Sequence, residues 1–396
     1  MKFACHMLRT FAGCQILLAL SACAAQAPEQ LPQAALAESA GAPTPAPAIG
    51  SSPCAPIDQP FVGTLCVPGG RGRRAAIVFF GGYGGNGDAR RLALEFAERG
   101  FVTAAVSYFG VAGAPRTLVD VPVEIGVAAV AVLARRNDVD PAHVAVMGTS
   151  KGGEYALLVA ATTPSVKAVI ANVPSPFAWY GLGARGVPTG CSWARGGRHL
   201  PCVPEDASAS KEIWKAMSAG NPVSFRAAYE AAARNTTAVE RALFPLDRIA
   251  GPVLCLSAAD DQVWNSSAQC ELAMTYLRAH HHPFADRAVS FPGAGHEYLL
   301  ARTGTSAAMN TAPMGAGGRI SFGGVPEADT RAAQAAIAAI DDLLLYQGST
   351  SNVGRPFDDA SAGAIRAVEV PGVEPSTRRS ESLRHCVGLR PMLRNF

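Results

Sequence analysis

Charged residues are scarce in this sequence: only 16% of its 396 residues are Asp, Glu, Lys or Arg. The 34 basic and 31 acidic side chains nearly balance, and the net charge of +3 argues against the basic surface typical of nucleic-acid-binding proteins. Hydrophobic residues make up 49% of the chain, which excludes a wholly disordered protein. We therefore expect one large folded domain with appendages, and no nucleic acid among its partners.

The sequence also lacks an N-terminal apolar run of the ~20 residues that a membrane-spanning helix needs. The run from Phe11 to Leu20 is shorter and follows Lys2 and Arg9, which predicts a secretory signal peptide over residues 1–22. The run ends in Leu-Ser-Ala-Cys, which resembles the lipobox of bacterial lipoproteins, so Cys23 is predicted to be a lipid-modified membrane anchor. The alternative is a plain signal peptide with Cys23 incidental. Both predict export, and the lipoprotein predicts the bacterial periplasm or outer membrane.

Export changes the interpretation of the ten cysteines, because an oxidising compartment permits disulfides. Beyond the leader and Cys23, six cysteines form three pairs of sequence neighbours, which are candidate disulfides. Cys255 lies in a predicted core strand, where a buried free thiol is the alternative, and Cys386 is left over. The candidate pairs are Cys54 with Cys66, Cys191 with Cys202, and Cys255 with Cys270.

Two segments are not expected to fold. Residues 23–52 are rich in Ala and Pro, the composition of a tether. Residues 348–396 are polar and basic and predict a disordered tail. A tail that contacts lipid headgroups, or a non-native extension from a shifted reading frame, are the alternatives. The folded domain is therefore expected over 53–347.

Within this domain, apolar runs without a polar alternate face predict strands, and helix-like stretches separate them. Such strands are typical of a mostly parallel sheet covered by helices on both faces, so the class is α/β. The stretch 174–246 has no clear strand rhythm and is interpreted as a cap insertion. An alanine-rich helix is predicted to end near Leu345. The predicted strands are 75–80, 102–106, 144–147, 166–171 and 253–257, and the predicted helices include 123–135 and 152–160.

Gly148-Thr149-Ser150-Lys151-Gly152 fits the pattern G-x-S-x-G. The pattern follows the predicted strand 144–147 and opens a helix, which is the context of the nucleophile elbow in α/β hydrolases. The glycines on either side leave room for the sharp turn. A glycine-rich turn with a solvated serine is the alternative. We therefore predict an α/β-hydrolase fold with Ser150 as nucleophile.

A serine hydroxyl needs a base to take its proton, and His296 is the candidate. It follows the apolar segment 288–291 in a loop, where this fold places its base. The histidines at 280–282 lack Glu or Cys at ligand spacing, so no metal site is predicted there. A carboxylate should orient the histidine, and both Asp260 and Asp261 follow the predicted strand 253–257. Spacing does not choose between them.

An acyl-transfer site also needs backbone N–H donors for the developing oxyanion. Lys151, which follows the nucleophile, is predicted to supply one, and Gly82 or Tyr83 in the glycine loop after the first long strand the other. Residues 82–87 also spell G-x-G-x-x-G. A dinucleotide site is not predicted, because the next strand ends at Ser107 without a ribose-binding acid.

Four motifs together resemble the C-terminal catalytic domain of the acyl-CoA thioester hydrolases and bile acid-CoA:amino acid N-acyltransferases. The resemblance implies a dienelactone-hydrolase-like α/β-hydrolase fold, and alignment on Asn265-Ser266 implies that Asp261 is the catalytic acid. The resembling segments are Phe80-Gly81-Gly82-Tyr83-Gly84-Gly85, Gly148-Thr149-Ser150-Lys151-Gly152-Gly153-Glu154, Asp260-Asp261-Gln262-Val263-Trp264-Asn265-Ser266 and Phe291-Pro292-Gly293-Ala294-Gly295-His296.

The chain departs from this family in two ways. Family members carry a β-sandwich ahead of the catalytic domain, and the segment before Ala75 is too short for one. The family acts largely on CoA thioesters inside cells, whereas this chain is expected to be exported. A serine nucleophile, where the family's amino-acid transferases use cysteine, implies hydrolysis rather than acyl transfer.

The sequence thus predicts a serine hydrolase of acyl thioesters or carboxylic esters, working through an acyl-enzyme and needing no cofactor. A dienelactone-hydrolase-like carboxylesterase acting on small esters, or a non-catalytic lipid-anchored binding module, are the alternatives. Glu154 is expected to pack or cap near the elbow. The cap residues Trp179, Tyr180 and Trp193 are expected to form the core of the cap, with an acyl pocket as the alternative.

Overall fold

The computed structural model describes residues 53–303, 310–314 and 318–348. The predicted signal peptide, Cys23 with its tether up to residue 52, and the predicted tail from 349 onward lie outside the described residues. Cys386 lies there too.

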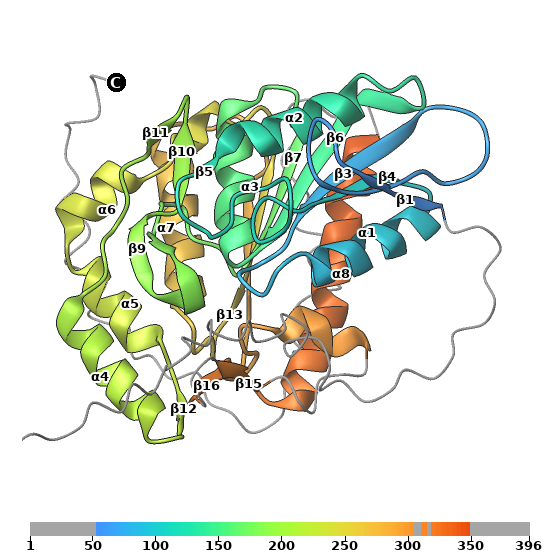
Figure 1. Cartoon of the computed structure of the whole chain (residues 1–396). Coiled ribbons are helices and arrows are strands. Elements are labelled where there is room, and N and C mark those ends of the chain that lie inside the picture. The colour runs from blue at the N-terminus through green and yellow to red at the C-terminus, as the bar shows by residue number, and fades with distance from the viewer. Residues whose placement is uncertain (1–52, 304–309, 315–317, 349–396) are drawn as a thin grey trace, which may run out of the picture. The chain divides into compact units, whose positions relative to one another are not determined.

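An eight-stranded sheet, mostly parallel, forms the centre of the domain (Figure 1). Its order is β1-β2-β4-β3-β6-β7-β13-β14, and only β1 with β2 and β2 with β4 pair antiparallel. The strand order and the predominance of parallel pairs identify the α/β-hydrolase fold, as predicted. The strands are β1 Cys54–Ile57, β2 Gly63–Cys66, β3 Arg74–Phe80, β4 Val102–Val106, β6 Val139–Thr149, β7 Ala168–Asn172, β13 Val253–Ala258 and β14 Arg287–Phe291.

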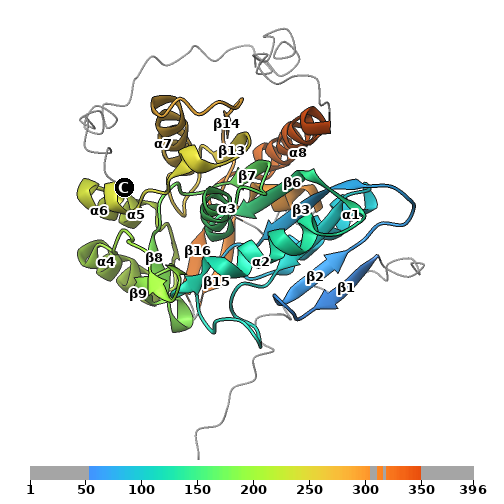
Figure 2. The same cartoon turned by 90° about the horizontal axis from the view of Figure 1, so that it is seen from above.

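Helices cover both faces of this sheet, because the central strands are apolar on both sides (Figure 2). In β3, Val78 and Phe80 point to one hydrophobic core, and Ile77 and Phe79 point to the other. The first core also contains residues of α2, α3 and α7, and the second contains residues of α1 and α8. These helices are α1 Gly87–Glu98, α2 Val123–Ala134, α3 Lys151–Thr162, α7 Ser266–Ala279 and α8 Pro326–Gly348.

The cap segment, residues 174–246 between β7 and β13, carries short elements outside the central sheet. Its strands form small sheets, two of which also take in strands from elsewhere in the chain: β10 pairs with β5 (Val121–Pro122), and β12 pairs with β16 (Gly318–Ser321), which pairs with β15 (Thr311–Met314). The segment contains β8 Tyr180–Leu182, η2 Ala184–Gly186, β9 Pro188–Cys191, β10 Trp193–Arg195, β11 Arg198–His199, α4 Ala207–Ser218, β12 Pro222–Val223, α5 Arg226–Ala233 and α6 Thr236–Ala242, and η3 Leu246–Arg248 begins at its last residue. The 3₁₀ turn η4, Tyr298–Thr303, follows β14.

Three disulfides join neighbouring parts of the domain. They are Cys54–Cys66 between β1 and β2, Cys191–Cys202 within the cap segment, and Cys255–Cys270 between β13 and α7. These are the three pairs that the spacing indicated.

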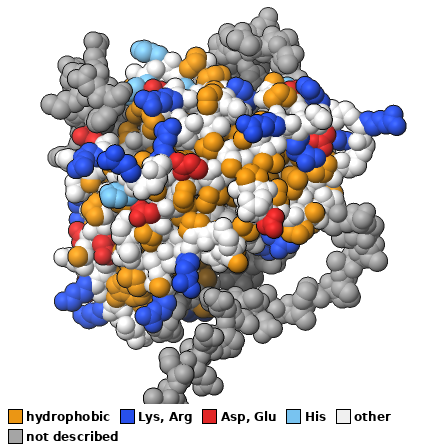
Figure 3. All heavy atoms as spheres, turned by 45° about the horizontal axis from the view of Figure 1, so that its top comes forward, with side chains coloured by type: hydrophobic (Ala, Val, Ile, Leu, Met, Phe, Trp, Pro, Cys, Tyr) orange, Lys and Arg blue, Asp and Glu red, His pale blue; other side chains and the backbone are white. Residues whose placement is uncertain are grey.

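Figure 3 shows acidic and basic side chains interspersed with hydrophobic ones on one face of the molecule. This mixture agrees with the nearly balanced charge of the sequence. Among the described residues, no helix combines the length and the apolar character that a membrane crossing requires.

Candidate active site

Ser150 lies at the tight turn between β6 and α3, with φ +57° and ψ −122°. Such a left-handed conformation is strained for a residue with a side chain and is a feature of nucleophile elbows. The turn depends on its glycines: a β-carbon on Gly148 would lie 1.9 Å from the Gly152 carbonyl oxygen, and one on Gly152 would lie 2.2 Å from the Phe80 oxygen. The serine is therefore held at a fixed position at the end of the sheet.

The Asp261 carboxylate is completely buried and contacts the His296 ring, with Oδ2 2.9 Å from Nδ1. Its other oxygen, Oδ1, accepts hydrogen bonds from the backbone N–H groups of Val263 at 2.9 Å and Trp264 at 3.1 Å. Both oxygens thus have partners, which fixes the orientation of the carboxylate and of the imidazole.

The neighbouring acid, Asp260, points elsewhere. Its two oxygens accept hydrogen bonds from the Gln262 side chain and from the Gly324 backbone N–H, both at 2.8 Å. Asp260 therefore stabilises the loop before α8. Of the two acids, only Asp261 contacts His296.

His296 is buried, with 2% of its surface exposed, and its ring lies edge-on to Trp264 with the ring centres 5.6 Å apart. Burial alone would lower the pKa of His296, but the charge and the hydrogen bond of Asp261 outweigh this and raise the pKa above its usual value. Among the described residues, no hydrogen bond joins the Ser150 hydroxyl to His296. Hydrogen bonds between catalytic groups are often loose without substrate.

The elbow and the histidine loop are joined through Asn172, the last residue of β7. Its backbone oxygen accepts a hydrogen bond of 2.9 Å from the Ser150 N–H. Its side chain donates to the Thr149 hydroxyl at 3.3 Å and accepts from the Tyr298 hydroxyl at 2.5 Å. Because Tyr298 lies two residues after His296, this buried amide links the segment of Ser150 to the segment of His296.

The glycine loop after β3 lies directly against Ser150. A β-carbon on Gly82 would be 3.4 Å from the Ser150 β-carbon and 4.0 Å from its hydroxyl oxygen. The side chain of Tyr83 stacks on Phe109, with the ring centres 6.1 Å apart, and 37% of the residue is exposed. The Tyr108 hydroxyl donates a 2.5 Å hydrogen bond to the Gly81 carbonyl. The loop is thus fixed beside Ser150, where backbone N–H donors are needed.

The two polar side chains of the first turn of α3 are fully buried. Lys151 is 1% and Glu154 0% exposed, and Lys151 Nζ lies 3.1 Å from Glu154 Oε2. Burial lowers the pKa of Lys151 and raises the pKa of Glu154, and each charge partly offsets the shift of the other. The lysine that follows the nucleophile therefore belongs to an internal ion pair.

A cavity lies under the glycine loop, on the side of α1. Its lining includes Gly82, Thr149, Asp88 and Glu297. Glu297 follows His296 directly, and burial raises the pKa of its carboxyl to about 7. The Glu297 carboxyl therefore changes its protonation state near neutral pH.

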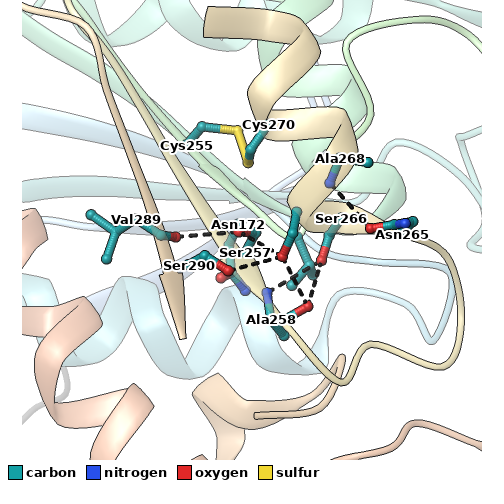
Figure 4. Close-up of a disulfide and its surroundings, with 12 residues drawn as sticks. Asn172, Cys255, Ser257, Ala258, Asn265, Ser266, Ala268, Cys270, Val289 and Ser290 are labelled. Atoms are coloured by element: carbon teal, nitrogen blue, oxygen red, sulfur yellow. Dashed lines mark hydrogen bonds between the residues drawn. A yellow bond between two sulfur atoms is a disulfide. The ribbon is translucent and has the colours of Figure 1, made fainter. Parts of the chain in front are cut away.

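The disulfide Cys255–Cys270 lies within the first core and joins β13 to α7, the two elements that flank the loop of Asp260 and Asp261 (Figure 4). The loop is also fixed by Asn265, whose side-chain oxygen accepts a 3.1 Å hydrogen bond from Ala268 N–H and caps α7. In the same region Ser266 bonds to the backbone of Ala258. Both ends of the β13–α7 connection are thus anchored.

The predicted cap aromatics are buried: Trp179, Tyr180 and Trp193 are 1%, 7% and 0% exposed. Tyr180 stacks on Tyr229 of α5, and Tyr229 contacts Trp264 at 5.4 Å. A continuous row of rings therefore leads from the cap to the ring that contacts the predicted base.

The histidines at 280–282 lie at the end of α7. His280 stacks on Tyr276, and His282 Nδ1 lies 2.6 Å from Asp286 Oδ2. Among the described residues, no group of three or more His, Cys, Asp or Glu side chains is arranged to hold a metal ion.

Residues 121–340 match the family model described as BAAT / Acyl-CoA thioester hydrolase C terminal. These residues are more than half of the 396-residue chain. The chain belongs to the BAAT / acyl-CoA thioester hydrolase C-terminal family. The family predicted from the four motifs is thereby confirmed.

Two relatives in this family illustrate the extent of the likeness. Acyl-coenzyme A thioesterase 6 of Mus musculus is 26% identical over 241 residues, which cover 59% of this chain and 51% of the relative. Acyl-coenzyme A amino acid N-acyltransferase 2 of Rattus norvegicus is 25% identical over 239 residues, with the same coverage of 59% and 51%. The chain thus spans about half the length of the curated relatives it matches.

Among solved structures, a dienelactone hydrolase-like promiscuous phosphotriesterase from metagenomic libraries is 17% identical. The likeness covers 73% of this chain and 95% of that chain, with a TM-score of 0.41.

Sequence reasoning missed several residues of this family member's candidate site. Asn172, Tyr108 and Tyr298 hold the proposed catalytic segments together, yet none belongs to a recognisable motif. The one available signal was positional: Asn172 and Tyr108 end or follow predicted apolar strands, and in α/β sheets functional groups gather at the carboxyl ends of strands.

Proposed function

We propose that this protein is a serine hydrolase that cleaves an acyl thioester or a carboxylic ester through an acyl-enzyme at Ser150. The observation that carries the proposal is the buried 2.9 Å contact between Asp261 and His296, in a fold whose nucleophile elbow holds Ser150 at a φ of +57°. Family membership supports the same reaction class.

In the proposed first step, the Ser150 hydroxyl oxygen attacks the acyl carbonyl carbon while His296 takes its proton. Asp261 stabilises the imidazolium that forms. The backbone N–H of Lys151 and an N–H of the Gly82-Tyr83 loop bind the oxyanion. When the intermediate collapses, the bond to the leaving sulfur or oxygen breaks, and His296 gives the proton to the leaving group.

In the proposed second step, a water molecule attacks the acyl carbon of the ester on Ser150, and His296 takes the water proton. Collapse of the second intermediate breaks the bond to the serine oxygen, which recovers its proton from His296. The products are a carboxylic acid and a thiol or an alcohol, and no cofactor takes part in either step.

For the substrate, we propose an acyl thioester or ester of small-molecule size. Support comes from the relatives of this chain, which include acyl-coenzyme A thioesterase 6 and peroxisomal succinyl-coenzyme A thioesterase, both of Mus musculus. Because this chain spans about half of those proteins, the ratio of thioester to ester hydrolysis has to be measured.

The test is hydrolysis of a panel of p-nitrophenyl esters and acyl-CoA thioesters by the full chain. We expect Ser150→Ala and Asp261→Asn to lose activity, by about 10⁴-fold or more, as in other triads. Asp260→Asn is the matched control, since Asp260 is the adjacent acid without a contact to His296, and it should keep most activity.

A mass spectrum of the quenched enzyme should show one acyl group on Ser150. Hydrolysis of small esters alone would favour the dienelactone-hydrolase-like alternative. If wild type and Ser150→Ala were equally inert and a fluorophosphonate probe left Ser150 unlabelled, a binding module would be the better interpretation.

We also propose that the chain is exported and anchored by a lipid on Cys23. The lipobox-like residues before Cys23 support this, and so do the three disulfides of the described domain, which suit an oxidising compartment. Labelled palmitate fed to an expressing bacterium should be incorporated into the wild type and not into Cys23→Ala. Incorporation into both variants, or into neither, would reject the anchor.

A further inference from the structure

The Lys151 side chain points away from the catalytic groups and into the cap segment. Its ammonium group donates to the Ser192 hydroxyl at 2.8 Å and to the Tyr180 carbonyl at 3.3 Å. Ser192 in turn donates to the carbonyls of Trp179 and Tyr180 at 3.0 and 2.9 Å. One side chain from the nucleophile turn thus binds both chain segments of the cap that run beside it.

Glu154, one helical turn later, binds the same part of the cap. Its Oε1 accepts hydrogen bonds from the Trp179 backbone N–H at 3.0 Å and from the Trp193 indole N–H at 2.5 Å. The other oxygen, Oε2, faces Lys151 Nζ at 3.1 Å. The two side chains of α3 therefore bind different groups of the same segment, 179–193, and among the described residues Glu154 Oε2 has no hydrogen-bond partner beside its ion pair with Lys151.

Because Lys151 and Glu154 are buried, their charges need partners within the protein. A charge in a protein interior is strongly unfavourable unless it is paired and hydrogen-bonded, and removal of one partner leaves the other uncompensated. Displacement of the cap would strip Lys151 and Glu154 of most of their hydrogen bonds. The ion pair thus resists any movement of 179–193 relative to the nucleophile helix.

We propose that Lys151 and Glu154 are positioning residues that lock the Trp179–Trp193 part of the cap onto the nucleophile helix and thereby set acyl-chain selectivity. This inference rests on the proposed function for its second half, because selectivity requires hydrolysis at Ser150. Its first half, the docking of the cap, does not depend on catalysis.

The route from the cap to the site is a row of aromatic rings. Tyr180 stacks on Tyr229 with the ring centres 5.3 Å apart, Tyr229 meets Trp264 at 5.4 Å, and Trp264 meets His296 at 5.6 Å. A loosened cap would shift this wall of rings while the Asp261–His296 pair, which belongs to the core loops, stays in place. We expect this shift to lower the hydrolysis rate of a substrate with a long acyl chain more than that of a substrate with a short one.

The experiment compares the full-length wild type with Lys151→Met and Glu154→Gln. The double variant Lys151→Met/Glu154→Leu removes both charges and leaves no unpaired one, so it keeps the test valid if the single variants fail to fold. The matched control is Lys215→Met, because Lys215 forms an i,i+3 pair with Glu212 on the cap surface, with side chains 79% and 72% exposed.

The first readout is amide hydrogen exchange of peptides that cover 177–194, with peptides from α1 as the internal reference. We expect exchange over 177–194 to accelerate by about tenfold or more in the Lys151 and Glu154 variants, with α1 unchanged. Lys215→Met should behave as wild type. Unchanged exchange over 177–194 in a folded variant would overturn the inference, whatever the activity.

The second readout is the ratio of kcat/KM for p-nitrophenyl octanoate to that for p-nitrophenyl acetate, which share a leaving group. We expect the ratio to fall by about tenfold or more, since misplaced binding surfaces cost this much in other enzymes. Global destabilisation would lower both rates together and leave their ratio unchanged. An unchanged ratio would therefore overturn the role of Lys151 and Glu154 in selectivity. If wild-type and Ser150→Ala proteins are equally inert, the proposed function fails, and hydrogen exchange alone decides whether the pair docks the cap.

Discussion

The Tyr298 hydroxyl donates a 2.5 Å hydrogen bond to the Asn172 side chain, and this bond joins the histidine loop to the strand beside the nucleophile. Both residues are fully buried. The bond connects segments 126 residues apart in the sequence, so it restrains the distance between Ser150 and His296 in a way that neither loop could achieve alone.

Removal of this bond should lower both the activity and the stability of the protein. Tyr298→Phe deletes one hydroxyl and leaves a buried acceptor without its donor, which costs about 1–3 kcal/mol of unfolding free energy. We expect kcat to fall by about tenfold or more, because small shifts between nucleophile and base are amplified in the rate. Steady-state kinetics measures the change in kcat, and thermal melts measure the change in unfolding free energy. Tyr276→Phe, which loses an exposed hydroxyl contact with Asp247, is the control and should be nearly neutral.

Tyr108→Phe should loosen the glycine loop. The lost hydrogen bond to the Gly81 carbonyl fixes the loop that lies against Ser150. We expect kcat to fall by about 10- to 100-fold with KM nearly unchanged, since oxyanion stabilisation acts on the transition state. Steady-state kinetics on one p-nitrophenyl ester is sufficient. A rise in KM at constant kcat would assign Tyr108 to substrate binding instead.

Gly152→Ala should prevent the elbow from forming. The new β-carbon would lie 2.2 and 2.4 Å from the carbonyl oxygens of Phe80 and Gly81, which are backbone atoms of the central sheet and its loop. We expect a loss of about 3 kcal/mol or more of unfolding free energy, or insoluble protein. Gly87→Ala is the matched control at the start of α1, because its β-carbon meets no atom within 4 Å. Equal melting temperatures for the two variants would contradict this account.

The pH profile should report the Asp261–His296 pair. The base must be neutral to accept the Ser150 proton, so kcat/KM should rise with pH as His296 loses its proton. Asp261 raises the pKa of His296, which places the midpoint above the ordinary histidine value of about 6.5. In Asp261→Asn the residual activity should show a lower midpoint. An unchanged midpoint in that variant would mean that another group controls the profile.

Glu297→Gln should change how stability depends on pH. The carboxyl of Glu297 has a pKa of about 7 in the folded protein, above the value of about 4.5 expected when unfolded, because burial opposes its charge. The unfolded state therefore loses this proton first, and the carboxyl weakens folding progressively as pH rises from about 4.5 to about 7. Around this carboxyl, His296 and Arg91 lower the pKa while Asp88 and Asp261 raise it.

Chemical denaturation at pH 5 and pH 8 checks this expectation. The wild type should lose more unfolding free energy than Glu297→Gln between the two values. Equal losses in both proteins would show that Glu297 ionises normally. Glu297→Gln should also lower the midpoint of the His296 activity profile, since the negative charge of Glu297 raises the pKa of His296.

The main sheet was predictable because each of its buried strands is a run of apolar residues. The strand predicted at 102–106 agrees with β4, and the helix predicted over 123–135 agrees with α2 to within one residue. The short strands β5 and β10 were not predictable, since each has only two or three residues and they pair with each other across a long sequence separation. Strands β15 and β16 pair with each other as sequence neighbours, and β16 also pairs with the distant strand β12.

The residues of the candidate site also differ in whether a local sequence pattern predicts their positions. Ser150 and His296 follow local patterns, so their positions could be predicted from the sequence. The choice between Asp260 and Asp261 depends on which way each side chain points, which spacing does not encode. Asn172 and Tyr108 act through contacts with segments far away in the sequence, and no local pattern distinguishes them from ordinary ends of buried strands.

The burial of Lys151 and Glu154 under the cap also bears on how this scaffold could be re-engineered. A transplanted cap that lacks the Ser192 hydroxyl and the Trp193 indole would leave these two side chains without partners that they have here. Such a chimera would contain buried charges without hydrogen-bond partners in the helix turn that follows Ser150. Successful recombination between relatives should therefore exchange the first turn of α3 together with the cap, as one module whose two halves are separate in sequence.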